Sequence, residues 1–89
     1  MEQFIFPALF YQEEGESQFT VVFPDLSIQT EGDTLVEAFL FAKSYLRVYC
    51  SYARKFDMEI PTPSKFEKIQ KDFPSFKCML VDAVIPTNE

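Results

Sequence analysis

Four carboxylates near the middle of the chain come closest to a catalytic arrangement. Within the stretch FPDLSIQTEGDTLVEAF they are Asp25, Glu31, Asp33 and Glu37. Carboxylates can bind a divalent metal, and a pair such as Asp25 and Asp33 could then support cleavage of a phosphodiester. The same residue types have structural roles after strand ends and at helix starts. We therefore expect this stretch to be a corner of the fold without a metal or a catalytic residue, and a metal-dependent nuclease is the least favoured reading.

The rest of the residue inventory offers little for catalysis. The sequence has no His, which excludes Ser-His, Cys-His and His-metal sites. Its 2 glycines cannot build a glycine-rich phosphate loop. Cys50 and Cys78 lack the CxxC spacing of a zinc site, and both lie in apolar runs. We expect two buried free thiols in a reducing compartment, no cofactor and no enzyme activity.

Length and charge limit the architecture and the partners. A chain of 89 residues has room for a single domain, 1–89. Its 14 acidic and 8 basic residues give a net charge of −6, which opposes direct binding of nucleic acid and favours a basic protein partner. The start lacks the pattern of a signal peptide, and no apolar run is long enough to span a bilayer. We expect a soluble, cytoplasmic protein with no membrane contact.

The elements that must position these residues follow from hydrophobic patterning. The spacing of apolar residues and the turn residues predict strands at 4–11, 19–23, 27–31 and 76–85, with a hairpin connection at 12–18. They also predict a helix at 34–55 and a helical turn or loop at 66–73. Pro7 cannot donate to a ladder, so the first strand is expected at a sheet edge, or with that position unpaired. The strand, strand, strand, helix, strand order predicts an α+β fold, a mainly antiparallel sheet with the long helix across one face.

The predicted helix is more apolar than one packed face requires. Thr34 and Glu37 have the spacing of a capping box at its start. A first stripe at helical spacing comprises Leu35, Phe39, Ala42, Leu46, Tyr49, Ala53 and Phe56. A second row, turned by about 100° at helical pitch, comprises Phe41, Tyr45, Val48 and Tyr52. This row is either ordinary core under another segment or a protein interface.

An ordered set of short motifs resembles the HicB-like antitoxin family. In chain order the motifs are FPA (6–8), FPDL (23–26), GDT (32–34), EAF (37–39), IPTPS (60–64) and the apolar strand 79–85. The turn after FPDL, residues 27–29, lacks the Pro or Gly of many family members. The chain also ends just after the last predicted strand, where full-length HicB proteins continue into a DNA-binding segment. We therefore expect no separate DNA-binding domain.

The resemblance implies a partial RNase H-like domain without nuclease residues. Such a domain neutralises a small basic HicA-like mRNA interferase by covering its active site and its RNA-binding surface. The alternative is an orphan protein of the same fold that self-associates in a structural or regulatory role and has no toxin. In either case we expect a homo-oligomer, dimer or tetramer. The candidate interface residues for toxin or self-contact are Phe41, Tyr45, Val48 and Tyr52 on the helix and Glu13, Glu14 and Glu16 in the hairpin.

Overall fold

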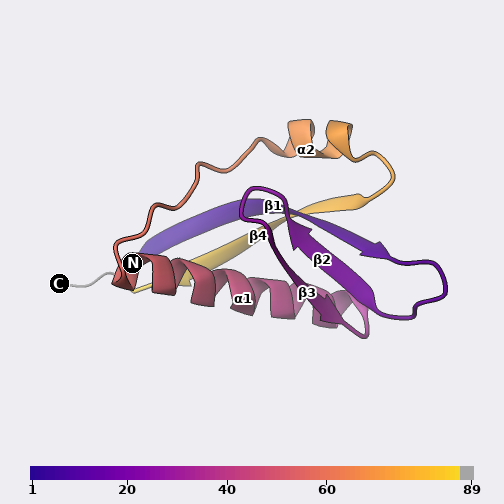
Figure 1. The fold of residues 1–89 in the computed structure, drawn as a ribbon, viewed down its shortest axis with the longest axis horizontal. Coiled ribbons are helices and arrows are strands. Elements are labelled where there is room, and N and C mark those ends of the chain that lie inside the picture. Colours follow the sequence, from indigo (N-terminus) through magenta and orange to yellow (C-terminus); the bar gives the residue numbers. More distant parts are fainter. Residues whose placement is uncertain (87–89) are drawn as a thin grey trace.

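An antiparallel sheet in the order β3-β2-β1-β4 forms the centre of the molecule (Figure 1). The structure is a computed structural model that describes residues 1–86. The strands are β1 (Glu2–Gln12), β2 (Phe19–Phe23), β3 (Ile28–Gly32) and β4 (Lys77–Ile85), and every pairing is antiparallel. The long helix α1 (Leu35–Lys55) packs on one face. The predicted α+β fold and its element order are confirmed.

The strand β1 is an inner strand, so the predicted sheet edge is wrong, whereas the predicted alternative, a strand with the Pro7 position unpaired, holds on the β2 side. It has β2 on one side and β4 on the other. The pairing with β4 covers Glu2 to Phe10, whereas the pairing with β2 covers only Leu9 to Gln12. Pro7 therefore lies opposite Leu80 of β4 and has no β2 residue opposite it. The proline is tolerated because the strand has a single neighbour at that position.

Helix α1 begins where the sequence predicts it. The backbone N–H of Glu37 donates to the Thr34 hydroxyl at 3.0 Å, and the Glu37 carboxylate accepts from the backbone N–H of Asp33 at 2.8 Å. The capping box is thus formed one residue wider than the standard pattern, in which the carboxylate accepts from the cap residue itself. It satisfies two backbone donors at the helix start.

The buried face of α1 differs in detail from the predicted stripe. Small side chains dominate it, namely Ala38, Ala42, Cys50 and Ala53, and Leu46 is its one large buried residue. Phe39 and Tyr49 flank this face and pack against the core while partly exposed. Phe56, predicted to be on the stripe, is the C-cap residue and is 54% exposed. Small residues let the helix lie close on the sheet, where the large buried groups come from the strands, including Phe6, Phe10, Phe23 and Val81.

The contact between the end of β3 and the start of α1 depends on Gly32. A Cβ at this position would lie 2.4 Å from the backbone nitrogen of Ala38 and 2.6 Å from its Cα. The predicted strand ends at residue 31, whereas in the structure Gly32 is the last residue of β3. The glycine is required by this close approach of two backbones.

The second helix covers part of the opposite sheet face. The segment 56–65 leaves the end of α1, keeps Ile60 packed against the core cluster beneath α1, and leads into α2 (Phe66–Asp72) (Figure 1). Ile69 of α2 packs with Leu9 and Cys78 in a small second cluster, supported by Phe66 and Phe76. In the described part of the chain, neither helix combines the length and apolar character that a bilayer crossing needs.

Candidate partner-binding surfaces

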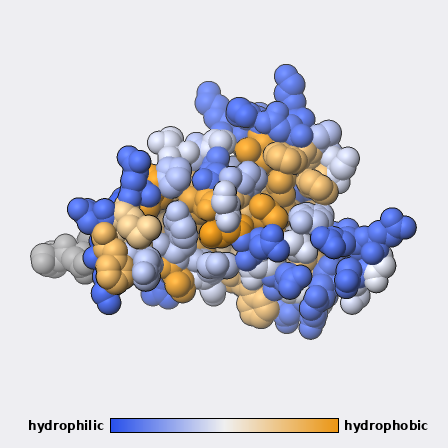
Figure 2. Space-filling model, in the orientation of Figure 1, coloured by the Kyte–Doolittle hydropathy of each residue, from blue (hydrophilic) through white to orange (hydrophobic). Residues whose placement is uncertain are grey.

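A polar hollow of about 100 Å³ opens on the sheet face that α1 does not cover. Its lining residues come from the β1–β2 hairpin, from β2 and from β3, and are Glu13, Glu16, Gln18, Thr20, Gln29 and Glu31. Figure 2 shows hydrophilic residues gathered at the end of the molecule where this hairpin lies. We call this feature the acidic hollow, because three of its six lining residues are glutamates.

The register of β2 and β3 builds the floor of the acidic hollow. Thr20 lies directly opposite Glu31, and Val22 lies opposite Gln29. Side chains alternate along a strand, so these residues point away from α1 while Val21 and Phe23 point into the core beneath it. Thr20 is only 6% exposed yet lines the hollow. Thr20 is therefore a largely buried residue of the floor, beneath the three more exposed glutamates.

The hairpin turn brings Glu13 and Glu16 to the rim of the hollow. The backbone N–H of Glu16 donates to the carbonyl of Glu13 at 2.9 Å, and the side chain of Gln12 closes the hairpin by donating to the carbonyl of Ser17 at 3.0 Å. Gly15 supplies the positive φ of 83° that this turn needs. Glu14 lies in the same turn but does not line the hollow.

The glutamates of the acidic hollow have no cationic partner within residues 1–86. The ion pairs of that part of the chain are Lys43–Asp82, Arg54–Glu2 and Lys68–Asp72. Glu13, Glu16 and Glu31 therefore present uncompensated negative charge around a concave site. A lysine or arginine side chain from another molecule has the charge and the donors that such a site accepts.

The aromatic row predicted on the helix is on the surface. Phe41, Tyr45, Val48 and Tyr52 are 47%, 40%, 63% and 58% exposed. The alternative in which these residues form ordinary core is therefore wrong for the single chain. No strand or folded-back segment among residues 1–86 buries them, since each of the four keeps at least 40% of its surface exposed. We call Phe41, Tyr45, Val48 and Tyr52 the aromatic row.

The structure separates the two groups of predicted interface residues. The aromatic row lies on α1, and α1 covers one sheet face, whereas the acidic hollow opens on the other face. The sequence indicates the same candidates for toxin contact and for self-association, and the fold places the two groups on opposite sides of the sheet.

The four central carboxylates lie apart, and three of them make separate structural hydrogen bonds. Asp25 accepts hydrogen bonds from Ser64, Asp33 accepts one from the Gln18 side chain at 3.3 Å, and Glu37 caps α1. Glu31 lines the acidic hollow. No group of three or more His, Cys, Asp or Glu residues in the part of the chain described here is placed to hold a metal ion.

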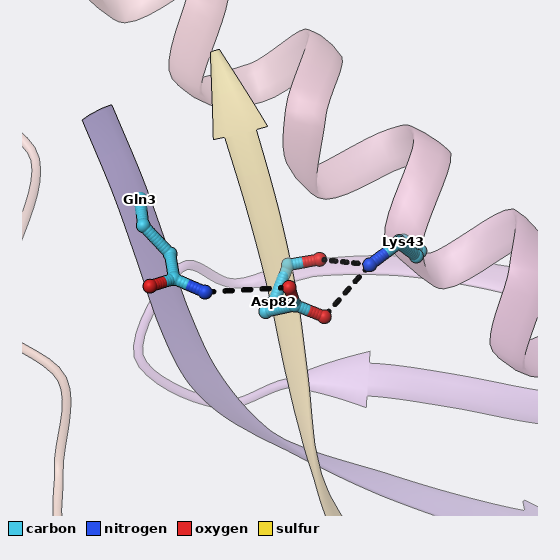
Figure 3. A network of polar contacts seen from close by, with 3 residues as sticks. All are labelled: Gln3, Lys43 and Asp82. Atoms are coloured by element: carbon cyan, nitrogen blue, oxygen red, sulfur yellow. Dashed lines mark hydrogen bonds and ion pairs between the residues drawn. The ribbon is translucent and has the colours of Figure 1, made fainter. Parts of the chain in front are cut away.

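A polar network binds α1 to the edge strand β4 (Figure 3). Lys43 Nζ donates to Asp82 Oδ1 at 2.7 Å and to the Asp82 carbonyl at 3.4 Å, and Gln3 Nε2 of β1 donates to Asp82 Oδ2 at 3.5 Å. The hydrogen bond from Lys43 lowers the pKa of Asp82 below its ordinary value. Lys43 donates to the carbonyl of Asp82 on edge strand β4. A charged side chain at a sheet edge disfavours pairing of that edge with other chains.

Four residues of the acidic hollow are absent from the predicted interface: Gln18, Thr20, Gln29 and Glu31. The sequence contains a pattern that could have indicated them, an alternation of polar and apolar residues along the strand. Polar Gln18 and Thr20 alternate with apolar Phe19 and Val21. That pattern predicts a strand with one polar, solvent-facing side. Only the pairing of β2 with β3 shows that the polar residues of the two strands are neighbours.

Comparisons with solved structures give the fold a family context. A chain of a toxin–antitoxin complex from Streptococcus pneumoniae matches with a TM-score of 0.78 and 22% identity, over 93% of this chain and 70% of that chain. The antitoxin HicB of Burkholderia pseudomallei matches with a TM-score of 0.75 and 18% identity, over 86% of this chain and 59% of that one. The N-terminal domain of the same antitoxin matches with a TM-score of 0.77 and 17% identity, over 94% and 100%.

These matches establish a HicB-like antitoxin fold, and the resemblance carried by the FPDL, GDT and IPTPS motifs is confirmed at that level. No protein-family model matches the sequence, and a comparison with curated proteins finds no significant match.

Proposed function

We propose that this chain is an antitoxin that binds and neutralises a small basic HicA-like mRNA interferase. The observation that carries the proposal is the fold, which this chain shares with a toxin–antitoxin complex and with the antitoxin HicB. The acidic charge supports it, since a protein with a net charge of −6 suits a basic partner.

The acidic hollow is the proposed contact for the toxin. A basic side chain inserted there meets the carboxylates of Glu13, Glu16 and Glu31 and the hydroxyl of Thr20. A toxin that uses lysines and arginines to hold RNA phosphates can present the same side chains to these carboxylates. When the carboxylates bind these basic side chains, the toxin can no longer hold RNA, and the antitoxin needs no catalytic step. We therefore propose a non-enzymatic, cytoplasmic inhibitor.

The test is RNA cleavage by the small basic protein encoded next to this chain's gene. We expect a molar excess of this chain to abolish cleavage, and the chain alone to leave RNA intact with or without magnesium or manganese. Cleavage that continues despite excess chain contradicts the antitoxin function. Cleavage by the chain alone contradicts the proposal that it is not an enzyme.

Charge reversal locates the contact. The triple variant Glu13→Lys, Glu16→Lys, Glu31→Lys should lose inhibition at least about a hundredfold, because each buried charged contact at an interface is worth several kcal/mol. Glu59→Lys is the matched control for each single reversal of Glu13, Glu16 or Glu31, since it changes the net charge equally, is exposed and lies in the segment 56–65, away from the hollow. Equal inhibition by the triple variant and the control would place the toxin on another surface.

A second candidate function is self-association without a toxin, favoured by the exposed aromatic row. The absence of any neighbouring gene for a small basic protein would support this orphan function. It makes no use of the acidic hollow, so the charge-reversal variants distinguish the two candidates.

A further inference from the structure

An open groove follows one side of α1, where the end of the edge strand β4 lies beside the helix (Figure 1). It consists of three adjoining hollows of about 370, 440 and 350 Å³, each larger than the acidic hollow. Arg47 lines the first and second of them, and Lys55 lines the second and third, so the three are continuous. We call this feature the basic groove, after the cations that line it: Lys43, Arg47, Arg54 and Lys55.

The charge of the basic groove is opposite to that of the rest of the chain. Half of the 8 basic residues line it, and no Asp or Glu among residues 1–86 does, although the chain has 14 of them. From Ala38 to Phe56 the sequence contains no acidic residue. The negative end of the helix dipole attracts Arg54 and Lys55 in the last turn. Arg47 lies in the middle of α1, where the dipole gives no reason for a cation.

Two of the four cations can receive a partner. Lys43 and Arg54 are each held by an ion pair within the chain. Arg47 and Lys55 form no ion pair with another residue of the described part, and both are exposed. They are eight residues apart on one helix, which is about 12 Å at 1.5 Å per residue. Two carboxylates four residues apart in an extended segment lie on the same side of it, about 13 Å apart, so they match this distance.

The floor between these two cations is apolar. Val48 and Tyr52 line the same hollow as Arg47 and Lys55, and they are 63% and 58% exposed. Nucleic acid offers phosphates to the cations, but a net charge of −6 repels a long polyanion. A short acidic peptide brings little charge and can place an apolar side chain between its carboxylates. The composition of the groove therefore favours a peptide.

We propose that the basic groove binds a short, extended, acidic segment of another protein, with carboxylates on Arg47 and Lys55 and an apolar side chain between them. Like charges oppose the basic toxin as the occupant. The acidic hollow opens on the sheet face that α1 does not cover. The groove is thus a site for a second partner, which goes beyond the proposed antitoxin function.

The experiment is an NMR titration of the isotopically labelled chain alone with a blocked peptide of seven residues. The peptide has glutamate at its second and sixth positions, phenylalanine at the fourth and serine elsewhere. We expect amide shifts around Arg47, Val48 and Lys55, none around Thr20 in the acidic hollow, and a dissociation constant of about 1 mM or lower. The same peptide with lysine in place of glutamate should not bind.

Charge reversal tests the contact. Arg47→Glu and Lys55→Glu should each raise the dissociation constant at least about fivefold, because an attraction becomes a repulsion. Lys71→Glu is the matched control for Lys55→Glu, since Lys71 is exposed on α2 and does not line the groove. It should leave the affinity within about twofold. Circular dichroism checks that each variant is folded.

Four results overturn the proposal. They are the absence of shifts at several millimolar peptide, equal binding of the lysine peptide, equal weakening by Lys71→Glu, and tighter binding of a single-stranded RNA of seven nucleotides. The last result would assign the groove to nucleic acid. Sedimentation of the same samples covers the remaining occupant, because a wild type that self-associates and a Lys55→Glu variant that does not would assign the groove to a second copy.

The titration contains no toxin, so its outcome does not depend on the proposed function. Arg47→Glu should inhibit the toxin as the wild type does, since inhibition is assigned to the acidic hollow. Loss of inhibition in this variant would assign the groove to the toxin and overturn the second partner, while the antitoxin function would stand. A wild type that binds the peptide but fails to inhibit the toxin would contradict the antitoxin function alone.

Discussion

Asp25 and Ser64, which are 39 residues apart in the chain, are joined by two hydrogen bonds to one carboxylate. The backbone N–H of Ser64 donates to Asp25 Oδ2 at 2.8 Å, and its hydroxyl donates to Oδ1 at 2.6 Å. One residue belongs to the turn after β2 and the other precedes α2. The contact therefore attaches the long return segment 56–65 to the sheet.

Removing the Asp25 carboxylate should destabilise the fold. Asp25→Ala leaves two partly buried donors of Ser64 without an acceptor, and we expect a loss of about 2–3 kcal/mol in the free energy of unfolding. Urea denaturation of Asp25→Ala, Ser64→Ala and the double variant measures the coupling between the two residues. We expect a coupling of about 1 kcal/mol, and additive single effects would show that the hydroxyl bond contributes nothing.

Gly32→Ala should be among the most disruptive small substitutions in the chain. The added methyl group meets the backbone of Glu37 and Ala38, which cannot move without displacing α1. The expected loss is about 3 kcal/mol, at the upper end for overpacking. Gly15→Ala is the comparison, because it has open space but a φ of 83°, and its strain costs about 1–2 kcal/mol. Thermal unfolding of both proteins checks the order, which would be reversed if α1 could shift freely.

The pair of Asp82 with Lys43 should make stability depend on acid pH. The lowered pKa of Asp82 means that the pair stabilises the fold above the ordinary carboxyl pKa of 3.8, and that this contribution is lost as the pH falls through the lower native value. The pair is partly exposed, so we expect less than about 1 kcal/mol. The difference in unfolding free energy between wild type and Lys43→Gln, measured from pH 6 to about pH 2, should shrink towards acid. A difference that is constant over this range would contradict the pairing.

Cys50 should produce the opposite dependence in alkali. Burial raises the pKa of its thiol from 9.0 to about 11. The unfolded chain therefore releases this proton first, and the stabilising contribution is present below pH 9 and is lost as the pH rises towards 11. Cys50→Ala removes this effect while other groups still titrate, so its stability should fall less steeply above pH 9. Parallel curves for the two proteins would show that Cys50 ionises equally in both states.

Local patterns predicted the elements of this fold well. The capping pair of Thr34 and Glu37 marks the start of α1 in the sequence, and the hairpin at Gly15 is equally evident. Pairing between distant segments was harder to predict. Pro7 suggests an edge strand by its chemistry, and only the short length of β2 explains how it lies in an inner strand. The acidic hollow depends on the β2–β3 register, which no single segment contains. Exposure of the aromatic row depends on where the segment 56–65 runs, and its prolines do not determine that path.

The pairing of β1 with β4 has a consequence for biosynthesis. These are the first and the last strands of the sheet in chain order, and they pair from Glu2 with Ile85 to Phe10 with Lys77. While the ribosome is still making β4, one side of β1 lacks its partner and the core beneath it is open. The sheet can close only after β4 has left the exit tunnel, so the domain cannot fold strand by strand as it is made. Until that closure, a new chain exposes apolar surface that chaperones can recognise and proteases can cut.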